Sequence, residues 1–107
     1  MKVYNKLIRD RIPEIIKKDG NTADIIILSD EAFKQAIKEK LIEEATEVLI
    51  ADNRDEVVNE LADLQEVIDT IKQIYNISTL EVNTTQAIKA LNRGKFEKRL
   101  YLKSVKE

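Results

Sequence analysis

Two pairs of acidic residues interrupt sequence that otherwise reads as apolar helix, within residues 43–67. Glu44 and Glu47 form the first pair, and Glu60 and Asp63 form the second. Residues three apart lie on neighbouring surface of an α-helix, so each pair presents two carboxylates on one side of its helix. Carboxylates placed in this way can hold a hard cation or exchange a proton, which makes these four residues the first candidates for chemistry.

Two long helices must position these carboxylates. Ser29 or Asp30 can cap a first helix that we expect to end near Ala51. Asn53, with a glutamate three residues later, resembles a capping box that opens a second helix to about residue 75. The chain between the two helices is short, which predicts that they form an antiparallel hairpin.

Each helix turns one carboxylate into its apolar stripe. At about 100° per residue, Glu44 falls within the first stripe and Glu60 within the second, while Glu47 and Asp63 lie at the edges. Glu43 is expected to point away. The apolar members are Phe33, Ile37, Leu41 and Val48 in the first stripe, and Val57, Leu61, Leu64, Ile68, Ile71 and Tyr75 in the second.

Antiparallel folding brings the two acidic pairs together. The midpoint of Glu47 and Glu60 coincides with that of Glu44 and Asp63, and it falls next to Asn53 in the proposed turn. With about 1.5 Å of rise per residue, all four carboxylates reach matching heights, roughly 10 to 15 Å from the turn. The spacing therefore predicts a cluster of four carboxylates between the helices.

Such a cluster needs compensation, because like charges repel and burial penalises every charged group. Protonation or a hard cation can supply it, and ligation by oxygen atoms alone suits Mg²⁺ or Mn²⁺. A polar helix interface, a dimer seam or a solvated acidic face would give the same pattern without a metal. All of these interpretations stay open at this point.

The composition narrows the available chemistry. The 107 residues include no cysteine and no histidine, which excludes thiolate nucleophiles, imidazole bases, disulfides and most zinc sites. Residues 1–18 carry six basic and two acidic side chains, residues 31–69 carry four and twelve, and residues 89–107 carry seven and two. This distribution fits a site that holds cations centrally and polyanions at its margin.

The length predicts one domain over residues 1–107 with a small core. Hydrophobic residues make up 43% and charged residues 36%, which is typical of a charge-rich globular protein and not of a disordered one. No apolar run approaches about 18 residues and the N-terminus is not signal-like, so we expect a cytoplasmic protein without a membrane segment.

The remaining elements are short. A first helix is expected with Asp10 as its N-cap and Gly20 as its stop, and a last helix from Ser78 to Gly94. Residues 25–28 and the chain termini read as extended, and these pieces could pair with one another. The predicted fold is all-α, a helix hairpin or bundle with short extended terminal segments.

The acidic motifs resemble those of the MazG-like superfamily of all-α nucleoside triphosphate pyrophosphohydrolases, whose signature is ExxE, a spacer, then ExxD. Here twelve residues separate Glu47 from Glu60. The segments "KLIEEATEVL" and "NELADLQEVI" are similar to the two motif helices. "YNKLIRDRIPEII" and "NRGKFEKRLYL" are similar to the ends of the small subgroup related to phosphoribosyl-ATP pyrophosphohydrolase. One departure is Lys95, which stands where that pattern has a second glycine.

The resemblance implies Mg²⁺-dependent cleavage of the α-β phosphoanhydride of a nucleotide, giving a monophosphate and pyrophosphate, with clearance of non-standard nucleotides as one role. Mn²⁺ is an alternative cation. One glutamate of the cluster, or Glu43, would accept the proton of the attacking water. The implied catalytic metal ligands are Glu44, Glu47, Glu60 and Asp63, and the candidate phosphate contacts are Lys40, Lys6, Arg9, Arg93 and Lys95.

A non-catalytic interpretation also stands, in which the chain is a helical dimerisation or nucleotide-binding module with a structural acidic cluster. Binding to nucleic acid is not expected, because the acidic middle would repel a phosphate backbone and aromatic residues make up only 5%. Among enzymes, the histidine-pathway pyrophosphohydrolase and a dUTPase-like activity are the nearest competitors. The expected partners are a nucleoside triphosphate and further copies of the chain, as a homodimer or homotetramer.

Overall fold

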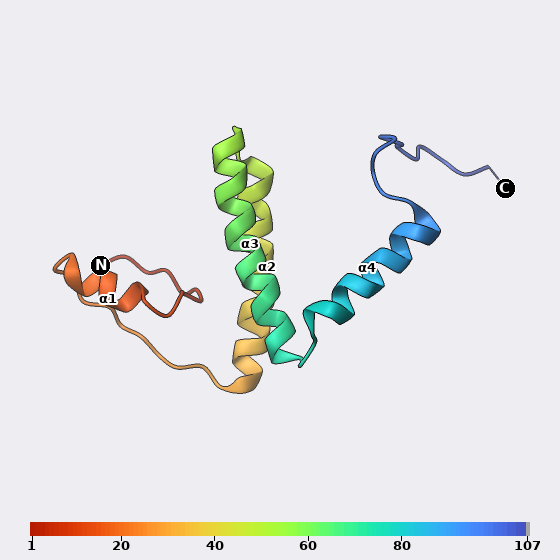
Figure 1. Ribbon diagram of the computed structural model, residues 1–107. Coiled ribbons are helices and arrows are strands. Elements are labelled where there is room, and N and C mark those ends of the chain that lie inside the picture. Colours follow the sequence, from red (N-terminus) through yellow and green to blue (C-terminus); the bar gives the residue numbers. More distant parts are fainter. Residues whose placement is uncertain (107) are drawn as a thin grey trace. The chain divides into compact units, whose positions relative to one another are not determined.

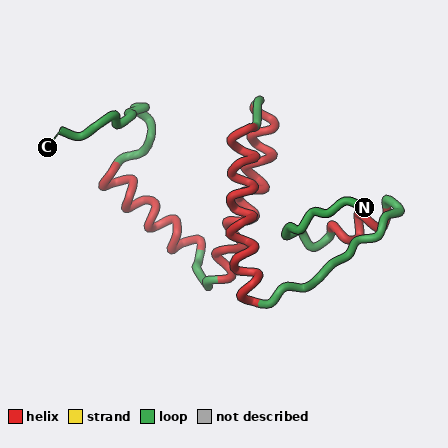
Figure 2. The backbone as a smooth tube through the Cα atoms, turned by 180° about the vertical axis from the view of Figure 1, so that it is seen from behind, coloured by secondary structure: helices red, strands yellow, loops and turns green. Residues whose placement is uncertain are grey.

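A computed structural model describes residues 1–106 (Figures 1 and 2), and this part of the chain contains four helices and no strand, which confirms the all-α prediction. None of these helices is long and apolar enough to cross a membrane. The chain divides into two units, Met1–Tyr75 and Asn76–Glu107. The helices are α1 (Ile12–Lys18), α2 (Asp30–Ile50), α3 (Arg54–Ile74) and α4 (Thr79–Arg93).

In the first unit, α2 and α3 run antiparallel side by side (Figures 1 and 2). Ser29 caps α2 by accepting a hydrogen bond from the Ala32 N–H at 3.3 Å. Asn53 caps α3 in the same way, accepting from the Glu56 N–H at 3.0 Å. The Glu56 side chain reaches back to the Asp52 N–H at 2.9 Å, one residue before the N-cap. The predicted bounds of both helices are confirmed within one residue, because they depend on local caps.

The contact between α2 and α3 is narrow. Among the residues described, only Ile37 and Val67 are buried hydrophobic side chains, at 4% and 5% exposure. The prediction that Leu61 and Tyr75 belong to the buried stripe is wrong, since they are 48% and 43% exposed. A single helix covers only a thin line on its partner, so side chains to either side of that line stay open to solvent.

The chain before α1 folds against the hairpin, and α1 begins later than predicted. Asp10 is not the N-cap: this position belongs to Arg11, whose side chain makes no capping bond. As an N-cap, Asp10 would have to serve the second or third helical N–H. Pro13 has no N–H, and the Ile12 N–H already donates to the Arg9 carbonyl at 3.1 Å. No donor is therefore left for the Asp10 side chain.

The end of α1 follows the prediction. Gly20 has φ +81°, which favours glycine, and its N–H donates to the Lys17 carbonyl at 3.0 Å. The Asn21 N–H donates to the Ile16 carbonyl at 3.1 Å. These two bonds form a Schellman motif, which closes the helix and releases the chain toward α2.

The segment between α1 and α2 forms neither helix nor strand, and the predicted pairing of extended pieces is wrong, since residues 1–106 contain no strand. Ile26 and Ile27 are 77% and 98% exposed. A short extended segment is stable as a strand only when a partner supplies ladder hydrogen bonds. The N-terminal residues do not supply them because they lie against the hairpin instead.

In the second unit, Ser78 caps α4 by accepting from the Glu81 N–H at 3.0 Å, and Gly94 ends the helix with φ +79°. Both features were predicted. Lys95, which replaces a glycine of the subgroup pattern, is not among the described residues with positive φ. The backbone at this position therefore does not require glycine, and lysine fits without strain.

The cap at Asn53 should control the stability of the hairpin. We expect Asn53→Ala to lower the free energy of unfolding by about 1 kcal/mol, because the Glu56 N–H loses its acceptor, and Asn53→Ser to retain most of the wild-type value. Urea unfolding followed by circular dichroism at fixed protein concentration measures both. An alanine variant as stable as the wild type would show that the cap does not stabilise the turn.

Candidate metal centre

Carboxylates from both helices of the hairpin meet in the apolar contact line. Glu44 of α2 and Glu60 and Asp63 of α3 each offer one oxygen atom, and these atoms all lie within 4.8 Å of one another. Glu44 is buried, with 8% exposure, and the other two residues are half-buried. The structure thus brings together three of the four carboxylates that the sequence singled out.

Glu47 lies outside this group. Its side chain is exposed, and the carboxylates that the described residues bring together do not include it. Three residues along a helix amount to about 300°, so Glu47 points about 60° away from Glu44. Asp63 stands at the same spacing from Glu60 and does belong to the group, so the spacing alone does not decide which edge carboxylate faces the other helix.

Lys40 compensates the buried charge of Glu44. Its Nζ lies 3.4 Å from Glu44 Oε1 and 3.3 Å from Glu43 Oε2, and its side chain is only 17% exposed. The prediction that Glu43 points away is wrong: it is half-buried and also lies 3.5 Å from the Nζ of Lys6. A projection of one helix cannot show this contact, because Lys6 belongs to the chain before α1.

Arg9 reaches the acidic group from the same N-terminal segment. Its Nη2 donates to Asp63 Oδ1 at 2.7 Å, a short charge-assisted hydrogen bond. Glu60 accepts a hydrogen bond from the neutral Asn59 amide at 3.3 Å. Basic and acidic side chains therefore neutralise one another only in part: Glu43 and the three grouped carboxylates face three cations, which leaves one net negative charge.

A cavity of about 320 Å³ adjoins the group. This volume lies at the lower end of the range for small-molecule pockets, about 300–1,000 Å³. Sequence reasoning did not single out Glu66, which lines the cavity three residues beyond Asp63, although this i+3 spacing was a usable signal. Residues 6–9 and Ile12 form one wall, and Lys40, Glu44, Asp63 and Glu66 contribute to the facing one.

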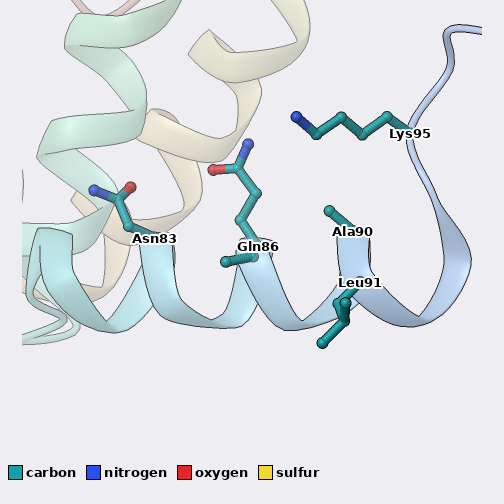
Figure 3. Close-up of a pocket in the computed structure, with 6 residues that line it drawn as sticks. Asn83, Gln86, Ala90, Leu91 and Lys95 are labelled. Carbon is teal, nitrogen blue, oxygen red and sulfur yellow. The ribbon is translucent and has the colours of Figure 1, made fainter.

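The other two basic candidates, Arg93 and Lys95, belong to the second unit. Arg93 is the last residue of α4. Lys95 follows the helix and its side chain points back along α4 (Figure 3). With Asn83 and Gln86 it lines a separate cavity of about 550 Å³, in which one ammonium group and two amides can make polar contacts.

The donor set of the acidic group fits a hard divalent cation. All of its donor atoms are carboxylate oxygens, the ligands that Mg²⁺ and Mn²⁺ prefer. One donor belongs to the buried Glu44, and a buried charge needs an opposite charge close by. Mg²⁺ bound by a few carboxylates keeps open positions, which substrate phosphates commonly occupy.

Comparison with known proteins agrees with this chemistry. A family model described as phosphoribosyl-ATP pyrophosphohydrolase matches residues 4–90. An uncharacterized protein of Mycolicibacterium smegmatis is 48% identical over 50 residues, which cover 47% of this chain and 51% of that relative, so the match spans about half of the relative's length. No solved structure matches the chain.

The family match covers the acidic group, the basic residues that face it and most of α4. It extends over most of the chain and continues from the first unit into the second. The chain therefore belongs to the phosphoribosyl-ATP pyrophosphohydrolase family, within the MazG-like all-α nucleotide pyrophosphohydrolases.

Proposed function

We propose that this protein is a Mg²⁺-dependent nucleoside triphosphate pyrophosphohydrolase, which cleaves the α-β phosphoanhydride and releases a nucleoside monophosphate and pyrophosphate. The observation that carries the proposal is the convergence of Glu44, Glu60 and Asp63 within 4.8 Å beside a cavity that basic residues also line. Membership of the family supports the reaction class. Clearance of non-standard nucleotides is the role we favour, with residues 1–107 acting as one domain.

Glu44, Glu60 and Asp63 would hold the cation, with Mn²⁺ as an alternative to Mg²⁺. Glu47 joins them in this proposal, because it lies one turn from Glu44 and its exposed side chain is free to change rotamer. When bound, the cation offsets charge on the polyphosphate and acidifies the attacking water.

The chain's own cations would bind the phosphates. Lys40 and Lys6 line the cavity beside the carboxylates, and Arg9 lies on the same wall as Lys6. Arg93 and Lys95 are proposed as phosphate contacts from the second unit. Lysine and arginine donate charge-assisted hydrogen bonds to phosphate oxygens, which would hold the anhydride in one orientation for attack.

One glutamate of the cluster, or Glu43, would accept the proton of the attacking water. Glu43 is half-buried beside the cavity-lining Lys6 and Lys40, and Glu47 is exposed one turn beyond Glu44. A base must lie within hydrogen-bond reach of the water, directly or through a second water. Glu43 would meet this requirement for a water that attacks a polyphosphate held by Lys6 and Lys40.

We also propose that the protein acts as a homodimer or homotetramer. Ile42 and Leu49 are 69% and 82% exposed and lie seven residues apart, on one face of α2 that points away from Glu44. Val58 on α3 is 53% exposed. Small domains struggle to bury enough apolar surface alone, and a second copy would cover these side chains.

A second candidate function is a non-catalytic helical module. The ion pairs of Lys40 with Glu44 and of Arg9 with Asp63 favour it, because they already compensate much of the acidic charge without a metal. In that case the cluster would fix the register of the hairpin, divalent cations would not change stability, and no nucleotide would be hydrolysed.

Pyrophosphate release from a panel of standard and damaged nucleoside triphosphates, with and without Mg²⁺, tests the reaction. We expect pyrophosphate release only with Mg²⁺. Glu60→Gln should lower the rate of release by at least about 100-fold, because loss of a metal ligand should cost at least as much activity as loss of a residue that orients a ligand. Asp55→Asn is the control, since this residue of α3 has a 96% exposed side chain. Equal rates in both variants would exclude the proposed ligand.

Thermal and chemical unfolding with Mg²⁺ and Mn²⁺ separates the enzyme from the structural module. At a cation concentration of 100 times the dissociation constant, we expect about 2.7 kcal/mol of added stability in the wild type. Glu44→Gln should lose this gain, and Glu39→Gln, an exposed acid on the same helix, should keep it. A wild-type protein that is indifferent to both cations would favour the structural module.

Sedimentation velocity tests the self-association. The wild type should sediment as a dimer or tetramer at micromolar concentration, and Ile42→Lys with Leu49→Lys should shift it toward the monomer, because two buried ammonium groups would be unpaired. Val3→Lys changes a 72% exposed residue outside the helices and serves as the control. A monomeric wild type would contradict the proposal.

A further inference from the structure

The N-terminal segment places a cation on one of the proposed metal ligands. We propose that Arg9 is an exchangeable counter-ion: its guanidinium pairs with Asp63 in the cation-free protein and turns to the nucleotide phosphates when a divalent cation takes that carboxylate. This role of Arg9 rests on the metal site proposed above. It adds a coupling between cation and nucleotide that the ligand set alone does not contain.

The contact of Arg9 with Asp63 is close but easily broken. The Nη2 of Arg9 lies 2.7 Å from Asp63 Oδ1, while the two side chains are 56% and 36% exposed. Ion pairs that are this exposed to water contribute little to stability, so exchange of the partner costs little. In contrast, the pair between Lys40 and Glu44 has exposures of 17% and 11%, and Lys40 holds two carboxylates at once.

Arg9 and a divalent cation compete for the same group. Asp63 Oδ atoms can accept from the guanidinium or contribute to the set of oxygens within 4.8 Å that includes Glu44 and Glu60. A guanidinium that stayed on Asp63 would also repel a cation bound to the three carboxylates. Arg9 therefore lowers the cation affinity of the nucleotide-free protein.

A new partner for Arg9 is available in the same cavity. Arg9 lines it together with Lys6 and Lys40, and the chain from Asn5 to Ile8 forms neither helix nor strand. The planar guanidinium matches two phosphate oxygens better than an ammonium group does. Since a bound polyphosphate would accept Arg9 and free Asp63, nucleotide would strengthen cation binding, and by reciprocity cation would strengthen nucleotide binding by the same factor.

Mn²⁺ binding measured by electron paramagnetic resonance of the free ion tests this role in the full chain, without turnover. We expect Arg9→Gln to bind Mn²⁺ about two- to fivefold more tightly than the wild type in low salt, as for a partly exposed ion pair. The gain should shrink as salt is added. Arg11→Gln removes the same charge from an 85% exposed side chain two residues away, which pairs with Glu14, and should leave the affinity unchanged.

A second titration uses a nucleoside triphosphate analogue with a methylene bridge between the α- and β-phosphorus atoms. In saturating Mn²⁺, Arg9→Gln should bind this analogue at least about threefold more weakly than the wild type. Arg9→Lys should recover part of the loss, because lysine keeps the positive charge but lacks the paired N–H donors of the guanidinium. Opposite signs for cation and analogue are the signature of an exchanging counter-ion, which a merely structural arginine would not give.

The outcomes are distinct. Mn²⁺ affinity that is unchanged or weaker in Arg9→Gln, with normal binding by the wild type, overturns the role of Arg9 and leaves the proposed function intact. Failure of the folded wild type to bind Mn²⁺ overturns the proposed metal site, and the role of Arg9 with it. An equal gain of Mn²⁺ affinity in Arg11→Gln would show that the effect comes from the net charge of the protein, and this result also overturns the role of Arg9.

Discussion

A buried carboxylate in the middle of the contact between α2 and α3 is the constraint on which this structure depends. Glu44 occupies a position where an apolar side chain would otherwise pack, and it is 8% exposed. A buried charge is tolerated only beside an opposite charge or hydrogen-bond donors. Lys40 on the preceding turn supplies that charge. Glu60 and Asp63 of α3 repel Glu44, which increases the positive charge needed to compensate the group. The hairpin therefore holds mutually repelling carboxylates at the centre of the contact between α2 and α3, where apolar side chains would pack most closely.

These carboxylates limit the core. Ile37 lies seven residues before Glu44 on α2, and Val67 lies seven residues after Glu60 on α3, so the buried apolar residues share the contact line with the acids. Each helical turn that places a carboxylate in the contact between α2 and α3 contributes no apolar side chain to the core. A two-helix contact of this kind provides little hydrophobic stabilisation by itself, and the proposed cation and the proposed further copies of the chain would add to it.

The helix caps and the helix hairpin could be predicted from the sequence, and the contacts of the segment before α1 could not. The caps at Ser29, Asn53 and Ser78 depend on neighbours three residues away, so the sequence indicates the helix bounds. The convergence of α2 with α3 follows from the symmetric spacing about the turn. The pairing of Arg9 with Asp63 spans 54 residues and follows from no period or motif, because it depends on where the segment before α1 folds.

The wrong predictions for the site residues also come from contacts that the pattern of one helix does not reveal. Glu47 was expected in the cluster and lies outside it, and Glu43 was expected to point away but is half-buried against Lys6 and Lys40. A helical projection judges a residue by one partner helix, whereas Glu43 faces a third element through Lys6. Asp10 failed as a cap for another reason: the first turn of α1 offers its side chain no free donor.

The balance of charge at the site suggests why the cation would matter before any bond is broken. Glu43, the three grouped carboxylates and the cavity-lining Glu66 outnumber the three facing cations by two, so the cation-free site offers a polyphosphate no net attraction. A divalent cation would cancel this excess of negative charge. Since attraction between charges depends on the local field, the same lysines and arginine would bind phosphate well only when their carboxylate partners are otherwise occupied. Cation binding would then be a condition for substrate affinity as well as for chemistry.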